Sequence, residues 1–148
     1  MGFFFSPPTK IVAFHATKMS TAPSVISADA LEALLTQLRE SDSERIRQAE
    51  AVLKKCLAQP HFMIDLLSRL HASQAAESRQ LAAVLMRRRL GGHWRKLDVG
   101  VQGQMKVALL ERLTNEPVSI VRSSTADLVC VIARQVCVCA CACVCGVQ

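Results

Sequence analysis

A short repeated motif constrains the fold of this chain more than any other feature of its sequence. Arg47–Leu53 (RQAEAVL) recurs 32 residues later as Arg79–Leu85 (RQLAAVL), with five of seven positions identical. A thinner copy follows after a further 43 residues, with Arg122, Ala126 and Leu128 at the same +4 and +6 spacing. Such periods on helical segments are typical of solenoids built from stacked helical pairs. Composition alone can make two Ala- and Leu-rich helices look alike, but it does not require the shared Arg-Gln pair, so a genuine repeat is favoured.

Hydrophobic periodicity predicts six helices, with each copy of the motif on the second helix of a pair. Leu31, Leu34, Leu35 and Leu38 have the i, i+3, i+4, i+7 spacing of one buried helical face. Strands are not expected, because β-branched residues do not alternate over any long stretch. We expect helices that begin near Asp29, span 43–58, begin at Pro60, span 74–90, begin at Asp98 and span 118–134. The predicted fold class is therefore all-α, a solenoid of about three helical pairs.

Local signals predict where some of these helices begin and end. Asp29 with Glu32 and Ser41 with Glu44 have the spacing of capping boxes, and Gly91-Gly92 predicts the end of the fourth helix. The repeated arginine is harder to explain, because a cation near a helix N-terminus is electrostatically unfavourable. We expect a carboxylate or carbonyl group of the adjoining repeat to compensate it, or the arginine to lie one turn inside the true helix start.

The chain divides into three parts of different character. Residues 1–28 contain Pro, Ser and Thr without helical periodicity, and we expect a flexible extension. Residues 29–135 carry the helical pairs. Residues 136–148 form an uncharged tail in which cysteine alternates with Val and Ala, and we expect this tail to be disordered.

The alternation of Val and Cys in the tail has two interpretations. A GT dinucleotide repeat encodes this alternation, and the codons of Gln135-Val136-Cys137 can form an exon end followed by a splice donor, which indicates intron read-through. Closely spaced thiolates also bind soft metals, but we expect no metal site. Cys56 and Cys130 lie in the body of the chain among apolar neighbours, where a reduced thiol packs as a small hydrophobic side chain.

Two stretches resemble the N-terminal region of the importin-β (karyopherin-β) family. Glu44–Glu50 is similar to the second helix of that family's first repeat, which bears an R-x-x-A-E-like run. Ser78–Leu90 is similar to the helix of the second repeat and is followed at the family's spacing by Trp94. Many members end that helix with L-K-N, whereas this chain has Arg87-Arg88-Arg89. The resemblance covers about residues 30–134.

The resemblance implies a curved array of HEAT repeats that takes part in nuclear protein import and shuttles between cytoplasm and nucleus. Its first repeats are expected to bind the small GTPase Ran in its GTP form, while cargo proteins and nucleoporins bind the full-length receptor. The second helices of the pairs, 43–58, 74–90 and 118–134, are expected to line the inner surface. Their expected solvent-facing candidates for Ran binding are Glu50, Arg79, Met86, Arg87 and Arg88.

Other functional classes remain open at this stage or are disfavoured. A generic HEAT-repeat scaffold without Ran binding has the same periodicity. The net charge of +6 and the basic residues around Arg87–Arg89 and Lys96 also suit a nucleic-acid-binding domain, although we expect Trp94 to be a packing anchor and nucleic acid not to be a partner. We expect no enzyme, cofactor or membrane span, since no nucleophile motif, phosphate-binding glycine loop or long uncharged apolar run occurs.

Overall fold

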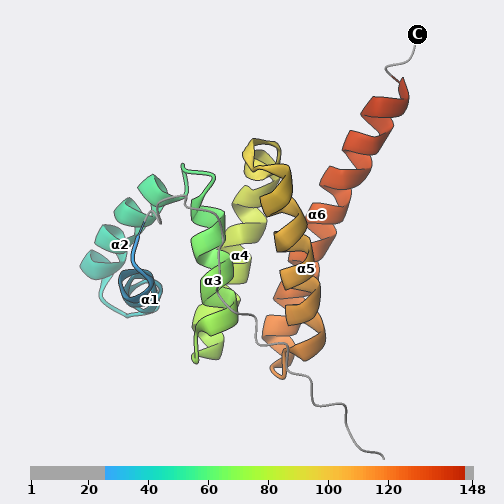
Figure 1. Cartoon of the computed structure of the whole chain (residues 1–148). Coiled ribbons are helices and arrows are strands. Elements are labelled where there is room, and N and C mark those ends of the chain that lie inside the picture. Colours follow the sequence, from blue (N-terminus) through green and yellow to red (C-terminus); the bar gives the residue numbers. More distant parts are fainter. Residues whose placement is uncertain (1–25, 146–148) are drawn as a thin grey trace, which may run out of the picture.

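The computed structural model describes residues 26–145, and their side chains as far as residue 137. This part of the chain folds into six α-helices and one 3-10 turn, with no strand among the described residues (Figure 1). The helices are α1 (Ala28–Gln37), α2 (Ser43–Cys56), α3 (Phe62–Ala72), α4 (Ala76–His93), α5 (Val99–Asn115) and α6 (Ser119–Cys145), and the 3-10 turn η1 covers Trp94–Lys96. The predicted all-α fold with three helical pairs is confirmed.

The pairs stack in chain order around one apolar core. Helix α4 packs on α3 and α6, α5 packs on α6, and α1 packs on α2, α3 and α4. In Figure 1 the α1/α2 pair is turned relative to α3/α4, so that α1 is seen nearly end-on. The stripe of Leu31, Leu34 and Leu35 on α1 recurs 32 residues later on α3, and all of its members are buried. The repeat therefore extends over both helices of the first two pairs.

Helix α4 runs through both glycines that were expected to stop it. The cost of each glycine within a helix is about 1 kcal/mol relative to alanine. Against this cost, Leu90, His93 and Trp94 are all buried, and Nε2 of His93 lies 2.9 Å from the carbonyl oxygen of Leu57 at the end of α2. Tertiary packing thus carries the helix three residues beyond the predicted end.

The N-caps differ from two of the three that the sequence suggests. Ser27 caps α1 by accepting a hydrogen bond from the N–H of Ala30, and Asp42, not Ser41, caps α2. Asp98 caps α5 as predicted, with its Oδ1 accepting a 2.8 Å hydrogen bond from the N–H of Gly100. In α2 the aspartate accepts from two N–H groups, Glu44 and Arg45, which explains why it displaces the neighbouring serine.

Helix α6 does not end near residue 134 but continues to Cys145 and projects beyond α5 (Figure 1). The expectation of a disordered tail is therefore wrong for residues 136–145. No Pro or Gly interrupts the chain before Gly146, and each added helical residue gains a backbone hydrogen bond once the helix exists. Residues 1–25 and 146–148 lie outside the described part of the chain.

A buried ion pair joins the second helical pair to the third. The guanidinium group of Arg79, near the start of α4, donates to both carboxylate oxygens of Glu116 at 3.2 and 3.0 Å. Its third nitrogen donates to the carbonyl oxygens of Ser73 and Gln74, at 3.1 and 2.9 Å. For Arg79, the expected compensation by a carboxylate of the adjoining pair is confirmed, while the two carbonyl groups belong to its own pair.

Glu116 lies in the turn between α5 and α6 and is only 2% exposed. It also accepts hydrogen bonds from the side chain of Arg112 and from the N–H of Val118. Burial alone would raise the pKa of Glu116, but the hydrogen bonds from Arg79, Val118 and Arg112 outweigh burial and hold the pKa below its usual value. The carboxylate is therefore charged at neutral pH and serves as the shared acceptor of two arginines.

We expect the Glu116→Ala variant to lose about 3–5 kcal/mol of unfolding free energy, because it leaves Arg79 buried and unpaired. Urea denaturation measures the loss, with Glu50→Ala on the exposed side of α2 as a control within about 0.5 kcal/mol of wild type. The double variant Arg79→Met/Glu116→Leu removes both charges and is expected to recover part of the stability. A Glu116→Ala variant as stable as the control would contradict this account.

The lowered pKa of His71 is expected to make the stability of the fold depend on pH near neutrality. Burial lowers the pKa of His71 below its ordinary value of 6.5, and the nearby charge of Arg112 lowers it further, against smaller opposing effects of Glu111 and a backbone hydrogen bond. The unfolded chain then binds a proton more readily than the folded one. The contribution of His71 to stability is complete above about pH 6.5 and is lost as the pH falls toward the folded-state pKa.

Urea denaturation at pH 7.5 and pH 5.5 is expected to show a loss of stability at the lower pH in the wild type and a smaller loss in His71→Gln. The matched control is His61→Gln, in the turn before α3, which should keep the wild-type loss. Equal losses in wild type and His71→Gln would refute the assignment to His71.

Candidate interaction surface

An ion pair joins the solvent-facing sides of α4 and α6. Nη1 of Arg87 on α4 lies 2.6 Å from Oδ2 of Asp127 on α6, and the two side chains bridge the helices. Further along both helices, Gly91 on α4 lies against the side chain of Gln135 on α6. The two helices therefore run side by side in the same direction, as expected for the second helices of consecutive pairs.

Three of the five predicted binding residues are exposed. Glu50 lies on the exposed side of α2, and Arg87 and Arg88 lie on the exposed side of α4. Arg87 is engaged by Asp127, whereas the guanidinium group of Arg88 has no ion-pair partner among residues 26–137. Glu50 likewise has no ion-pair partner in that range, so Glu50 and Arg88 are the candidates whose charges are available to a partner.

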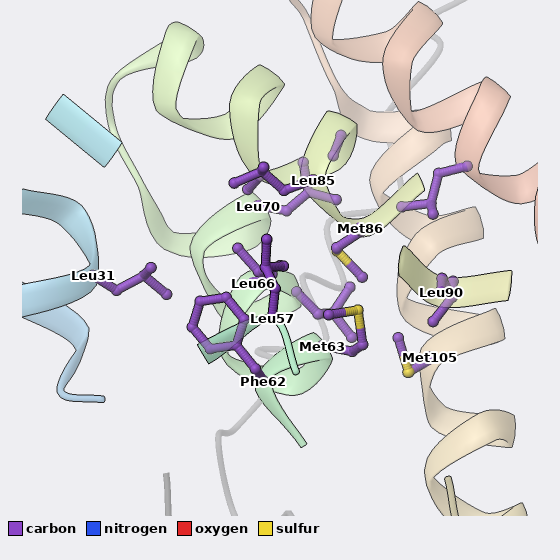
Figure 2. Packing of buried hydrophobic residues seen from close by; sticks show 14 of the residues in the cluster. Leu31, Leu57, Phe62, Met63, Leu66, Leu70, Leu85, Met86, Leu90 and Met105 are labelled. Atoms are coloured by element: carbon purple, nitrogen blue, oxygen red, sulfur yellow. The ribbon is translucent and has the colours of Figure 1, made fainter. Parts of the chain in front are cut away.

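The other two predicted residues, Arg79 and Met86, do not face solvent. Arg79 is 7% exposed, and its guanidinium group is engaged in the ion pair with Glu116. Met86 is fully buried, and Figure 2 shows it among Met63, Leu90 and Met105. Both side chains lie on the face of α4 that the third helical pair covers, a neighbour whose position a helical wheel of α4 alone does not reveal.

Helix α2 is set apart from the surface that α4 and α6 share. It packs on α1, and its connection to α4 is at the end of the helix, where His93 meets the carbonyl oxygen of Leu57. The start of α4 is tied instead to the end of α1 through Arg39 and Glu77, with a nitrogen–oxygen distance of 3.8 Å. The expected single surface over all three second helices is thus restricted to α4 and α6, and Glu50 lies on a separate element.

The basic run after Arg87 is exposed, but the aromatic residue beside it is not. Arg88, Arg89, Arg95 and Lys96 are exposed and have no ion-pair partner in the described part of the chain. Trp94 is 2% exposed, and Nζ of Lys106 lies 5.8 Å from its ring centroid. The prediction that Trp94 is a packing anchor is confirmed. A buried indole offers no platform on which a nucleic-acid base can stack.

Within residues 26–137 no group of three or more His, Cys, Asp or Glu side chains is placed to hold a metal ion. Burial raises the pKa of the Cys56 thiol, and Asp65 adds to the effect, so this thiol is a weak nucleophile at neutral pH. No helix in the described part of the chain is long and apolar enough to span a bilayer.

Two residues that matter for this surface were not singled out from the sequence. Glu116 has a sequence signal, since it stands six residues before Arg122 just as Ser73 stands six before Arg79. Asp127 has no comparable signal, because the residue that faces Arg87 depends on the register between α4 and α6.

Part of the chain is similar to known proteins. The family model described as "Importin-beta N-terminal domain" matches residues 49–115, from the middle of α2 to the end of α5. The chain is 37% identical over 105 residues to importin-4 of Mus musculus and, equally, of Homo sapiens. It is 30% identical over 105 residues to a Schizosaccharomyces pombe protein described as "Probable importin subunit beta-4".

The aligned region covers 70–71% of this chain but only 10% of each relative. The chain therefore spans about a tenth of the length of the curated relatives that it matches. No solved structure matches it at comparable significance.

Proposed function

The chain belongs to the importin-β family through its importin-beta N-terminal domain, and we propose that it binds the small GTPase Ran in its GTP form. The observation that carries this proposal is the match of residues 49–115, which include the whole of α4. The exposed side of that helix carries Arg87 and Arg88. Ran binding by the first repeats is what membership of this family implies.

The proposed contact surface is the exposed side of α4 together with the adjoining side of α6. Arg88 supplies a cation with no ion-pair partner among the described side chains, and the Arg87–Asp127 pair holds a second cation beside it. Electrostatic complementarity of this kind contributes chiefly to specificity and association rate. Glu50 on α2 is a second, separate contact. Arg79 and Met86 are not part of the proposed surface, because both side chains are buried between helical pairs.

Binding that depends on the nucleotide requires a difference in affinity between the two states of Ran. The proposed role is therefore one of recognition without catalysis. Transport of cargo, contact with nucleoporins and shuttling between cytoplasm and nucleus belong in this proposal to the longer receptor, of which the 105 aligned residues cover about a tenth. The chain itself is expected to retain Ran binding and none of these three activities.

Binding of the 148-residue chain to Ran loaded with GTP or with GDP tests the proposal, with isothermal titration calorimetry as the readout. We expect binding in the GTP form alone. Arg88→Glu should weaken it by roughly tenfold or more, because a charge reversal removes one ion pair and introduces repulsion. Unfolding of this variant should match the wild type, since the side chain is exposed.

The matched control is Lys55→Glu, a charge reversal at another exposed cation on α2 that is not among the proposed contacts. It should change affinity by less than about threefold. Equal binding of both nucleotide forms, or binding of neither, would contradict the proposal and leave a HEAT-repeat scaffold without Ran recognition. Binding of nucleic acid that falls steeply with added salt would instead support the basic nucleic-acid-binding alternative.

A further inference from the structure

A group of five exposed cations lies along one edge of the stack, at the turns that join its helices. Lys54 and Lys55 stand in the last turn of α2, Arg89 stands near the end of α4, and Arg95 and Lys96 belong to η1. All five residues are exposed. In Figure 1 the α2–α3 and α4–α5 connections lie at the same, upper end of the molecule. These five residues are called the basic edge.

A contact between two helix ends brings the parts of the basic edge together. Nε2 of His93, the last residue of α4, lies 2.9 Å from the carbonyl oxygen of Leu57, which follows α2. Both lysines of the edge lie within three residues of Leu57, and both cations of η1 lie within three residues of His93. Cations from α2 and from η1 therefore flank one point of contact.

No carboxylate within residues 26–137 forms an ion pair with the basic edge. The only acidic residue in segments 54–61 and 88–98 is Asp98. Its Oδ1 already accepts the 2.8 Å hydrogen bond that caps α5. The edge is therefore a concentration of positive charge without a counter-charge from the described part of the chain.

The opposite edge of the stack also carries cations, but there they are paired. At the turn between α1 and α2, Nη1 of Arg45 lies 2.7 Å from Oε2 of Glu40, and Arg79 at the start of α4 is paired with Glu116. Like charges that are gathered without partners repel one another and add no stability to a compact chain. The contrast between the two edges points to a partner that supplies the negative charge.

Helix dipoles do not explain the missing counter-charge. The negative end of the dipole favours a cation in the last turn of any helix. Arg69 near the end of α3 and Arg112 near the end of α5 occupy such positions and still pair with Glu32 and Glu116. The ends of α2 and α4 differ from these two helix ends in lacking an ion pair within residues 26–137.

The surroundings of the basic edge favour an acidic protein segment over a nucleic acid. Phe62 at the start of α3 and Trp94 in η1 are 0% and 2% exposed, so neither ring is available to stack on a base. Stacking on aromatic side chains supplies much of the affinity for single-stranded nucleic acids. Carboxylates pair with guanidinium and ammonium groups through charge-assisted hydrogen bonds and need no such platform.

We propose that the basic edge binds an acidic segment of a partner protein, whose Glu and Asp side chains pair with the cations of α2, α4 and η1. The edge lies at turns between the described helices α2 to α5, and Arg87 and Arg88 of the proposed Ran surface are not part of it. Residues 1–25 of this chain carry no acidic residue and do not supply these carboxylates. The proposal therefore adds a second binding surface to the one proposed for Ran.

The test uses the complete chain in reducing buffer and three fluorescein-labelled peptides as probes. In these peptides serine alternates with Glu, with Gln or with Lys. Fluorescence anisotropy is expected to show binding of the Glu peptide that weakens as salt is added, and binding of the Gln and Lys peptides that is roughly tenfold or more weaker. Equal affinity for the Glu and Gln peptides would overturn the proposal.

Double variants of the chain locate the binding on the basic edge. Lys54→Gln/Lys55→Gln and Arg95→Gln/Lys96→Gln should each weaken binding of the Glu peptide by roughly tenfold, because each removes two ion pairs with the peptide. Thermal unfolding of both variants should match the wild type, since all four side chains are exposed and unpaired.

The matched control is Arg45→Gln/Arg47→Gln at the start of α2. It removes the same net charge, but from two arginines that are already paired with Glu40 and Glu44. It should change affinity for the Glu peptide by less than about threefold. An equal loss in the control and in the edge variants would show that net charge alone governs binding and would overturn the proposal.

Two further outcomes decide against the proposal. Labelled oligothymidine of the same charge that binds more tightly than the Glu peptide, and less tightly to Arg95→Gln/Lys96→Gln, would assign the edge to nucleic acid. Loss of Ran-GTP binding in Lys54→Gln/Lys55→Gln would make the edge part of the Ran contact. The peptide assay contains no Ran and the edge variants keep Arg88, so failure of either proposal leaves the other intact.

Discussion

The carboxylate of Glu116 is the point at which the second and third helical pairs are joined. Arg79 is held near the start of α4, where the helix dipole disfavours a cation, and it is almost completely buried. A buried guanidinium group is tolerated only when its charge and its donors are satisfied. Because Glu116 belongs to the α5–α6 turn, that condition is met only when the third pair is packed in place, and the orientation of α6 along α4 follows from it.

The residue six positions before the repeated arginine is serine in the first two helical pairs and glutamate in the third. Ser41 precedes Arg47, Ser73 precedes Arg79, and Glu116 precedes Arg122. Ser73 donates to Glu32 of α1 at 2.9 Å, a contact weaker than the bidentate pair that Glu116 forms with Arg79. The first pair is thus attached by weaker polar contacts, which include the longer and more exposed ion pairs Arg39–Glu77 and Arg69–Glu32. The second and third pairs are joined by the buried ion pair, and the guanidinium group of Arg122 has no carboxylate partner within residues 26–137.

The repeats in the sequence are sufficient to predict the fold, but they predict the interaction surface only in part. The motif at Arg47, Arg79 and Arg122 predicts the helical pairs and the need for a compensating group, since both follow from local spacing and charge. Arg79 and Met86 were wrongly predicted to be exposed. The side of α4 that becomes buried depends on how α6 aligns with it, and α4 alone does not reveal that alignment. The passage of α4 through Gly91 was missed for a related reason: the burial of Leu90 and Trp94 outweighs the local preference of glycine.

Hydrogen exchange measured residue by residue on the wild type and on Glu116→Gln tests most directly whether this carboxylate couples the pairs. If it does, amides of α4 and α6 lose protection together in the variant, because local openings follow cooperative units, while amides of α2 keep theirs. Loss of protection confined to α5 and α6, with α4 unchanged, would show that the pairs are held independently and would contradict the account.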